Sequence, residues 1–573
     1  MTLPRRDGPG HDVVVLGSGA AGLTAALAAA VGGADVGLYE KADVLGGTTA
    51  ISGGIVWVPG NHLMEPAEQA GDPAEALRYL LALAGDALDL PVAESFVSAG
   101  AEMLRFVESY SPCRFRLLAG YPDYHPEVPG ARPGGGRSLE PELFDLSVLG
   151  EWAGRICFWD GEPRPVLLSE TSPGGAVKPL PGTLIARRRQ RGVCGMGEAL
   201  VGSLLAGCLD AGVAVRAGAR ARRLVTAGGR VTGVRFEVPA PEAAAGEAGA
   251  GEFTVEARRG VILATGGFEW NEDLVRSHLR GPMDAPAGVP TNTGDGLEMA
   301  TAAGAALGNM AQAWWAPMAR VPGEEAWGAP RFRLVLAERT RPGSIMVNSA
   351  GERFCNEAAD YNSLGGALHS LGPGTPGPGT PGPGTPGPGT PGSATPDETA
   401  SAAWLVCDDR YRRRYPLPGC RRAAEPPPWV HRGDTLAELA AAIGVPTTAL
   451  SETVAEFNRH AAAGTDPAFG RGASAYDLFN GDRTLPGAAA TLGPLDEPPF
   501  YAVAIRIGAL GTSGGPRTDE RGRVLDRSGT AIPGLWAAGN VMAAPTATVY
   551  GGAGGTLGPA MTFGYLAGRD AAN

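Results

Sequence analysis

The chain has 573 residues, 44% of them hydrophobic, which is enough for more than one hydrophobic core. Its formal net charge of -12 leaves no broad basic surface, so the composition argues against nucleic acid as a partner. The seven cysteines form no C-x-x-C pair, which gives no sign of a disulfide framework or a metal site. No apolar run is long enough for a transmembrane segment, and there is no signal-peptide pattern. We therefore expect a multi-domain cytoplasmic protein, with peripheral membrane contact left open.

The first 40 residues predict a βαβ unit. Residues 12–16 are a short β-branched apolar run, residues 20–31 are rich in alanine and leucine, and residues 35–39 read as a second strand. Such a unit has a right-handed crossover in nearly all proteins, so a parallel sheet covered by helices is expected.

A glycine-rich turn joins the first strand to the helix. Gly17 is suited to the tight turn, Gly19 lets the backbone approach a pyrophosphate, and Gly22 allows close packing of helix against strand. Glu40, at the end of the second strand, can accept hydrogen bonds from a ribose diol. In a chain with 88 glycines this match alone is weak. Three further small-residue stretches strengthen it, at residues 46–54, 261–267 and 534–540.

The middle of the chain is less regular. The arginines at 187–191 are expected in an exposed loop, and residues 281–342 in a loop-rich, partly buried region. Residues 371–397 repeat glycine, threonine and proline, which predicts a disordered surface loop, with a functional tether as the alternative. A Thr435-x-x-Glu438 capping box opens a predicted helix that ends near residue 443, and a second helix should follow at 446–458.

The four glycine-containing pieces, in this order, resemble the flavin-binding half of the fumarate reductase and 3-ketosteroid dehydrogenase superfamily. The resemblance implies noncovalent FAD and, since only one dinucleotide fingerprint is visible, an external electron acceptor such as a quinone instead of a nicotinamide. The residues expected at FAD are Gly17, Gly19, Ala20, Ala21, Gly22, Glu40, Lys41, Gly46, Gly47, Thr48, Thr49, Ser52, Gly53, Gly54, Ala221, Ala264, Thr265, Gly266, Asn292, Gly294, Asp295, Gly539, Asn540, Gly555, Thr556 and Leu557.

The same resemblance implies an α/β fold. A Rossmann-like FAD-binding domain, a parallel sheet with helices, should comprise residues 1–310 and 505–573. A discontinuous α+β catalytic domain should comprise residues 311–504 and contain the repeat.

Three tyrosine segments are similar to those of 3-ketosteroid Δ1-dehydrogenases, at residues 122–124, 347–361 and 550–563. The resemblance makes Tyr361 the general base that removes a proton next to a ketone, with Tyr124 hydrogen-bonded to it. Tyr550 and the backbone N–H of Gly554 would hold the carbonyl oxygen. Loss of that proton builds enolate charge on the oxygen, and two preorganised donors stabilise it. The neighbouring carbon would then release hydride to the flavin N5.

Several alternatives stay open. Gly551 and Gly552 follow Tyr550 where Δ1 enzymes often carry proline, and this is similar to Δ4-(5α)-ketosteroid dehydrogenases. A fumarate-reductase-like enzyme would need cations and histidines at the flavin, and only His125 lies in a matching segment. A flavin-binding protein without catalysis is the third alternative. The favoured hypothesis is an FAD-dependent dehydrogenase acting on the CH–CH group beside the ketone of a 3-ketosteroid or similar polycyclic ketone.

Overall fold

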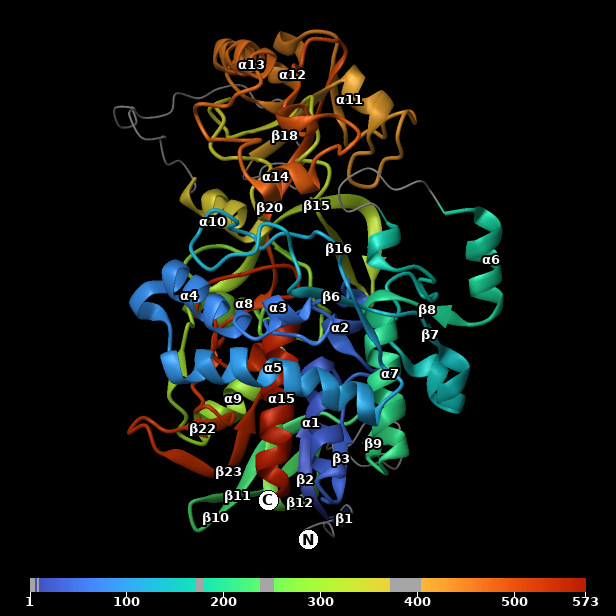
Figure 1. Ribbon diagram of the computed structural model, residues 1–573, viewed down its shortest axis with the longest axis vertical. Coiled ribbons are helices and arrows are strands. Elements are labelled where there is room, and N and C mark those ends of the chain that lie inside the picture. Colours follow the sequence, from blue (N-terminus) through green and yellow to red (C-terminus); the bar gives the residue numbers. More distant parts are fainter. Residues whose placement is uncertain (1–5, 8–9, 172–179, 238–251, 372–402) are drawn as a thin grey trace, which may run out of the picture.

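The fold contains two main sheets (Figure 1). The computed structural model describes residues 6–7, 10–171, 180–237, 252–371 and 403–573. The repeat at 371–397 falls almost entirely on residues 372–402, outside the described part. One sheet lies at the lower end of Figure 1, near both chain ends, and the other extends toward the upper end.

The first sheet has nine strands, which run in the order β10-β11-β12-β2-β3-β9, with β1 and β23 also paired to β12, and β22 to β23. Strands β2, β3, β9, β12 and β23 pair in parallel. The bounds are β1 Arg6–Asp7, β2 His11–Leu16, β3 Val36–Tyr39, β9 Ala214–Arg216, β10 Ala221–Ala227, β11 Arg230–Glu237, β12 Glu252–Leu263, β22 Arg523–Leu525 and β23 Ala531–Ala537.

The predicted βαβ unit is present. Helix α1 covers Ala20–Val31, and β2 pairs in parallel with β3, from Val13 opposite Val36 to Leu16 opposite Tyr39. The expected mid-chain and C-terminal strands also meet here, because Val261 of β12 lies opposite Leu535 of β23. The carboxyl ends of these parallel strands therefore share one edge of the sheet, where ligands of open α/β folds bind.

Helix α15 (Leu557–Ala572) packs closely against α1. A Cβ atom on Gly564 would lie 2.4 Å from the carbonyl oxygen of Ala21, and one on Gly568 would lie 2.3 Å from that of Ala25. Only glycine fits at these two positions, so the helix that follows the last predicted tyrosine segment is held against the helix that follows the nucleotide turn.

The second sheet has seven strands in the order β16-β15-β20-β18-β17, with β13 and β19 also paired to β20. Every pair is antiparallel except β13 with β20. The bounds are β13 Ala285–Pro286, β15 Ala313–Ala326, β16 Ala329–Leu334, β17 Ser344–Val347, β18 Ala403–Asp408, β19 His431–Gly433 and β20 Phe500–Thr512.

Helices cover both faces of this sheet. Leu405 and Cys407 of β18 pack in one core with helix α10 (Tyr361–Ser370), whereas Trp404 and Val406 pack in another with α12 (Leu436–Ile443) and α13 (Thr447–Ala462). This alternation follows from the two-residue period of a strand. Strand β20 crosses residue 505, where a domain boundary was expected, and the division into residues 1–310 with 505–573 and 311–504 remains a proposal.

The remaining elements connect or flank the sheets. The helices are α2 Gly47–Ile51, α3 Pro66–Gln69, α4 Asp72–Ala84, α5 Leu90–Tyr110, α6 Gly182–Gln190, α7 Met196–Asp210, α8 Glu272–His278, α9 Asp295–Ala302, α11 Asp409–Arg414 and α14 Ala475–Asn480, with 3-10 turns at η1 Gly85–Ala87, η2 Leu146–Arg155, η3 Leu168–Glu170, η4 Gly487–Ala490 and η5 Gly539–Val541. The short strands are β4 Val56–Trp57, β5 Phe115–Leu117, β6 Ser138–Pro141, β7 Phe144–Asp145, β8 Val193–Cys194, β14 Leu307–Gly308 and β21 Gly515–Pro516. Within the described ranges no helix is both long and apolar enough to cross a bilayer.

Three local predictions need correction or refinement. Residues 281–342 are not mainly loop: they include the long hairpin of β15 and β16, in which Trp315 and Met318 are buried in two different cores on opposite faces of the sheet. The arginines at 187–191 lie largely in helix α6, where Arg188 pairs with Glu170 at 2.7 Å. The Thr435 hydroxyl caps α12 by accepting from Glu438 N–H, as expected, but the Glu438 carboxylate accepts from the N–H of the preceding residue, 434.

Candidate active site

The nucleotide turn needs its glycines. Gly17 has φ +105, a conformation that side chains disfavour, and a Cβ there would lie 2.2 Å from the Ala264 carbonyl oxygen. A Cβ on Gly22 would lie 1.9 Å from the Gly17 carbonyl oxygen. The N–H of Ala20, at the start of α1, donates to the Thr49 hydroxyl at 3.1 Å. The turn is therefore compact, with its backbone close to the second small-residue stretch.

Glu40 is buried at the end of β3. Its Oε2 accepts hydrogen bonds from the N–H of Ser18 at 3.0 Å and from the Ser18 hydroxyl at 2.7 Å. Its Oε1 accepts from the N–H of Ala42 at 2.9 Å. The carboxylate thus fixes the glycine turn, and each of its oxygens has lone-pair capacity for a ribose hydroxyl as well. Predicted residue Ala221 begins β10 two positions after Ala219, whose N–H donates to the Glu40 carbonyl oxygen.

Four other polar residues predicted at FAD lie in two hydrogen-bonded groups. Lys41 Nζ lies 2.8 Å from Asp295 Oδ2, so this pair is joined directly. The Asn292 amide donates to the Thr48 hydroxyl at 3.0 Å and to Glu269 Oε1 at 2.6 Å. Glu269 did not appear among the predicted site residues, although it follows the predicted Gly266 by three positions.

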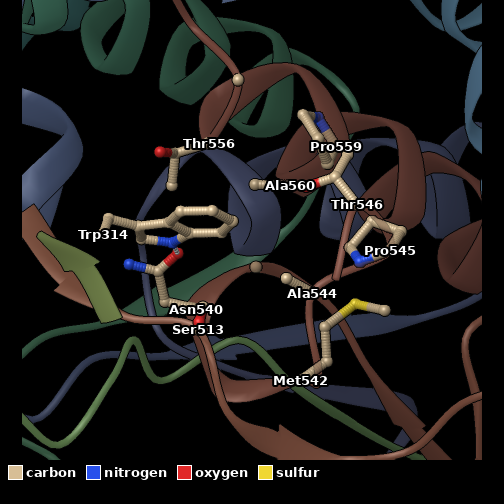
Figure 2. Close-up of a pocket in the computed structure, with 12 residues that line it drawn as sticks. Trp314, Ser513, Asn540, Met542, Ala544, Pro545, Thr546, Thr556, Pro559 and Ala560 are labelled. Carbon is tan, nitrogen blue, oxygen red and sulfur yellow. Dashed lines mark hydrogen bonds between the residues drawn. The ribbon is translucent and has the colours of Figure 1, made fainter. Parts of the chain in front are cut away.

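A pocket lies where the C-terminal part of the predicted set comes together (Figure 2). Gly539, Asn540, Gly555 and Thr556 line it. The remaining predicted residues lie outside this lining. Trp314 lies at the pocket's edge and donates from Nε1 to Asn540 Oδ1 at 3.3 Å.

The residues present fit FAD. Among the buried polar atoms that have no hydrogen-bond partner within the described residues, three lie at or next to the residues predicted at FAD: Thr265 Oγ1, Glu269 Oε2 and, in the pocket lining, Ser513 Oγ. Buried polar atoms are normally paired, so these three are available to a polar ligand. Together with the glycine turn at the start of α1, they offer donors and acceptors along an extended cofactor.

The three predicted tyrosines meet in one buried cluster. Ring centroids lie 5.4 Å apart for Tyr124 and Tyr361, 5.2 Å for Tyr361 and Tyr550, and 5.4 Å for Tyr124 and Tyr550. Trp314 contacts Tyr550 edge-on at 5.3 Å, and the Thr556 hydroxyl donates to the Tyr550 hydroxyl at 2.9 Å. The cluster therefore borders the pocket that Trp314 and Thr556 line.

Burial sets the protonation of these phenols. It raises the pKa of Tyr124 and of Tyr361 well above the usual value, and it raises the pKa of Tyr550 as well. A hydrogen bond from Tyr124 acts in the opposite direction on the pKa of Tyr361. A neutral Tyr550 can donate to a carbonyl oxygen, and Tyr361 has the neighbouring hydroxyl that a phenol acting as a base requires.

Two glycines after Tyr550 allow close packing of its loop. A Cβ on Gly552 would lie 2.6 Å from the indole Nε1 of Trp57. Gly554 has φ +93, and a Cβ there would lie 2.6 Å from the backbone nitrogen of Trp57. The Gly554 N–H has no hydrogen-bond partner among the described residues, so it is free to donate to a ligand.

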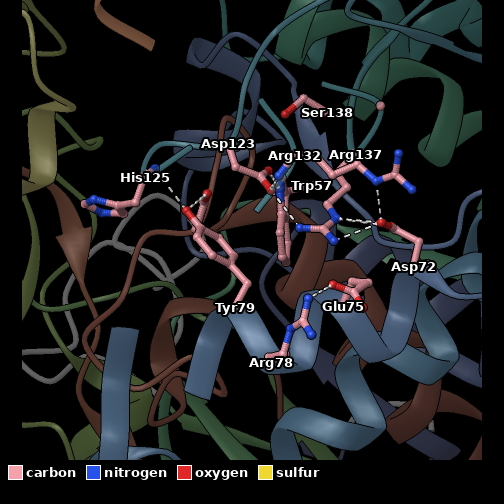
Figure 3. Close-up of polar contacts among 12 residues, drawn as sticks. Trp57, Asp72, Glu75, Arg78, Tyr79, Asp123, His125, Arg132, Arg137 and Ser138 are labelled. Carbon is pink, nitrogen blue, oxygen red and sulfur yellow. Dashed lines mark hydrogen bonds and ion pairs between the residues drawn. The ribbon is translucent and has the colours of Figure 1, made fainter. Parts of the chain in front are cut away.

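A polar network fixes the Tyr124 segment against this loop (Figure 3). Asp123 is buried and accepts from Arg137 Nη1 at 2.6 Å. The Tyr124 N–H and the Tyr79 hydroxyl both donate to the Gly551 carbonyl oxygen, at 3.0 and 2.8 Å. Two tyrosine segments far apart in sequence are thus joined by main-chain contacts.

The Tyr361 segment is held by buried charges. Glu357 lies 2.7 Å from Arg353 and 3.1 Å from Arg471, and Arg353 also pairs with Asp466 at 2.9 Å. Burial alone would raise the pKa of Glu357, but the two guanidinium groups hold it at about 2. Four residues later, Tyr361 begins helix α10.

Several residues near the site were not predicted. Tyr476 stacks edge-on against Tyr124 at 5.0 Å, and Tyr121 lies 6.2 Å from Tyr476. Tyr121 shares the segment of Tyr124, and Ser513 lies in a Thr-Ser-Gly-Gly run similar to residues 52–54, so both had a signal in the sequence. Tyr476 had none, because it reaches the cluster only through the fold. In the part of the chain that the structure describes, no group of side chains could hold a metal ion.

Comparison with known proteins places this geometry in a family. Residues 12–557 match the family model of the FAD binding domain. The chain is 41% identical to 4-oxocyclohexanecarboxylate 2-dehydrogenase from Sinomonas cyclohexanicum, across 98% of this chain and 92% of that protein. It is 40% identical to 3-oxosteroid 1-dehydrogenase from Mycobacterium tuberculosis, across 97% of each. The structure of 3-ketosteroid Δ1-dehydrogenase from Sterolibacterium denitrificans, in complex with 1,4-androstadiene-3,17-dione, superposes with a TM-score of 0.85 at 32% identity, covering 99% of this chain and 100% of that one.

Proposed function

Because this chain belongs to the FAD binding domain family that includes the 3-oxosteroid 1-dehydrogenases, and is an FAD-dependent oxidoreductase acting on a CH–CH group, we propose that it desaturates a 3-ketosteroid in the ring that carries the ketone. The observation that carries this proposal is the cluster of three tyrosines, 5.2 to 5.4 Å apart, beside a free backbone N–H and the predicted cofactor pocket. The 40% identity to a 3-oxosteroid 1-dehydrogenase supports the choice of substrate.

The proposed mechanism begins with the carbonyl oxygen. The Tyr550 hydroxyl and the Gly554 N–H donate to it and stabilise the negative charge that develops when the adjacent carbon loses a proton. Tyr361 accepts that proton as the ionised phenolate, and the hydrogen bond from the Tyr124 hydroxyl, which opposes the effect of burial on the pKa of Tyr361, stabilises that phenolate. When bound, FAD supplies the acceptor for the hydride that leaves the neighbouring carbon. The buried cluster excludes water, so these interactions act in a medium of low dielectric constant.

A smaller keto acid is the second candidate substrate. The relative at 41% identity is a 4-oxocyclohexanecarboxylate 2-dehydrogenase. A carboxylate substrate needs a cation, and Arg339 is fully buried with an Nη2 that has no partner among the described residues. The positive charge of Arg339 acts to lower the pKa of Tyr121 and the pKa of Tyr476. Because such an effect requires a short distance, Arg339 lies close to the tyrosine cluster.

The sequence alternatives are not favoured. A fumarate-reductase-like reaction and a protein without catalysis both fit poorly with relatives at 40% identity that are dehydrogenases over nearly the full length. A Δ4-(5α) reaction is not favoured for the same reason, because those relatives are 1- and 2-dehydrogenases. We also propose that electrons leave to an external acceptor such as a quinone.

Anaerobic reduction tests this proposal. We expect 4-androstene-3,17-dione to bleach the flavin absorbance of the purified protein within seconds, and 4-oxocyclohexanecarboxylate to do so much more slowly. The reverse order would make the keto acid the substrate class. A spectral shift without bleaching by either compound would contradict a dehydrogenase of this kind, and product analysis by mass spectrometry and NMR would identify the bond oxidised.

A further inference from the structure

Glu269 is a buried carboxyl group that the proposed mechanism does not use. Its side chain is 3% exposed, and it lies six residues beyond the end of β12, at the edge where the parallel strands meet the cofactor residues. Oε1 accepts a hydrogen bond from the Asn292 amide at 2.6 Å, whereas Oε2 has no partner among the described residues. Such an oxygen is costly to bury when charged, so its position calls for a physical reason.

Glycines make the space that this carboxyl occupies. A Cβ on Gly288 would lie 2.2 Å from Oε1, and one on Gly267 would lie 2.5 Å from Oε2. A Cβ on Gly511 would lie 3.7 Å from Oε1 and 2.3 Å from the Asn540 amide nitrogen. The carboxyl group is therefore enclosed by backbone from three segments, close to Asn540 of the cofactor pocket.

Among the residues that the structure describes, no cation faces the Glu269 carboxyl group. The groups that face it are the Asn292 amide, the Thr48 hydroxyl and the backbone of residues 267, 288 and 511–512. Within the described residues, no charged side chain contributes to the pKa of Glu269, which burial raises to about 7 against the opposing effects of the Asn292 amide and of the backbone N–H groups of residues 269 and 512. At neutral pH this group can therefore change its charge in response to a new charge nearby.

We propose that Glu269 binds one proton when the bound flavin receives hydride from the substrate, and releases that proton when the flavin is reoxidised. Hydride transfer brings two electrons and one proton, and so adds one negative charge to the site. Protonation of the Glu269 carboxylate removes one negative charge nearby, and the proton comes from water, which also receives the proton that Tyr361 took from the substrate. On reoxidation by a quinone, two electrons go to the quinone, and the hydride's proton together with the Glu269 proton complete its reduction to the quinol.

The charge argument explains why a carboxyl group suits this place. Two negative charges in a medium of low dielectric constant repel strongly, so an ionised Glu269 would oppose reduction of the cofactor. A carboxyl group whose pKa burial has raised toward neutrality takes up a proton near pH 7 at little cost in free energy. The Asn292 amide donates to both Glu269 and Thr48, and Asn292 and Thr48 are among the residues predicted at FAD. Glu269 is therefore in direct contact with residues expected at the cofactor.

The midpoint potential of the bound flavin tests this proposal without any ketone. For a two-electron couple, a tenfold change in an equilibrium constant corresponds to about 30 mV, so each additional proton taken up adds about 30 mV per pH unit to the slope. We expect the potential of the wild-type protein, titrated with dithionite and a reference dye, to fall with pH above pH 7 more steeply than that of Glu269→Gln, by up to about 30 mV per pH unit. Parallel slopes of the two proteins from pH 6 to 9 would overturn the proposal.

A matched control separates Glu269 from a general loss of charge. Glu272→Gln removes a carboxylate three residues away in α8, where the side chain is 89% exposed, and should retain the wild-type slope. Glu269→Asp keeps a carboxyl group and should restore a steeper slope than Glu269→Gln. A Glu269→Asp slope equal to that of Glu269→Gln would contradict a titrating carboxyl.

The wild-type protein offers a test that needs no variant. The infrared spectrum of the reduced protein minus that of the oxidised protein at pH 8 should show a gain in the carbonyl absorption of a protonated carboxyl group. No gain would overturn the proposal, even if Glu269→Gln failed to fold or to bind flavin. Since dithionite replaces the substrate, a failure here leaves the proposed steroid activity untouched, and failure with steroids leaves this result intact.

Discussion

The two ends of the active site are built by different means. At the nucleotide turn, glycines and main-chain groups make the site: Gly17 and Gly22 approach neighbouring carbonyl oxygens more closely than any side chain would allow. At the tyrosine cluster, side chains from residues 124, 361, 476 and 550 make the site, and buried ion pairs hold their segments. The comparison teaches that cofactor binding and catalysis can be separated by mutation. Substitutions in the tyrosine cluster should leave the cofactor bound, whereas substitutions in the glycine turn should abolish its binding.

The strongest test of this separation is Tyr361→Phe. Loss of a general base costs about 10²- to 10⁴-fold in rate, so we expect kcat to fall by that factor while the flavin-to-protein ratio stays at the wild-type value. Steady-state assays with a dye acceptor and the flavin absorbance measure the two quantities. Tyr501→Phe, a buried tyrosine of β20 that pairs with Asp409, serves as the control. A wild-type rate in Tyr361→Phe would remove this residue from the mechanism.

Tyr550→Phe should have the next largest effect. A lost donor to a developing oxyanion costs about 10²- to 10³-fold, and the same donor contributes to ground-state binding. We therefore expect kcat/KM to fall by that factor with a rise in KM, again with full flavin content. Tyr565→Phe, at a buried tyrosine of α15 that lies outside the cluster and donates to Glu102 at 2.7 Å, should stay close to the wild-type protein. Unchanged kinetics in Tyr550→Phe would place the ketone elsewhere.

Gly22→Ala tests the other end of the comparison. The added methyl group would lie 1.9 Å from the Gly17 carbonyl oxygen, which forces the turn away from the helix. We expect the purified variant to retain less than about a tenth of the wild-type flavin, with a loss of activity in proportion. Gly71→Ala is a suitable control, because its φ is -89 and no atom lies within 4 Å of its Cβ position. Wild-type flavin content in Gly22→Ala would show that the turn does not hold the cofactor.

The smallest effect on activity at neutral pH is expected from the buried ion pairs that hold the Tyr361 segment. Their contribution to stability can be tested by unfolding the protein at acid pH. The pKa of Glu357 is lowered from 4.5 to about 2 in the folded protein, so its contribution to stability is present above pH 4.5 and lost as pH falls toward 2. The difference between these two pKa values corresponds to about 3 kcal/mol in the free energy of unfolding. Urea unfolding between pH 5 and 2 should show this loss in the wild-type protein and in the exposed control Glu352→Gln, but not in Glu357→Gln. Equal pH profiles of Glu357→Gln and the wild-type protein would contradict it.

The difference between the two ends also explains what the sequence could predict. The βαβ unit and its glycine turn depend on neighbours in the chain, so residues 12–40 could be read with nearly correct bounds. The hairpin of β15 and β16 could not, because prolines and tryptophans there suggested loops, while tertiary packing against β20 stabilises strands. Likewise Tyr476 and Glu269 have no local signal: Tyr476 joins its cluster through the position of α14, and Glu269 lies among three separate glycine segments.

The contact between α1 and α15 has a consequence for biosynthesis. The nucleotide turn at Gly17 leaves the ribosome before the helix that packs on α1 and the pocket residues from Gly539 onward, which lie more than 500 residues later in the sequence. The two parts of the proposed cofactor site can therefore come together only after the more than 500 residues between them have been translated.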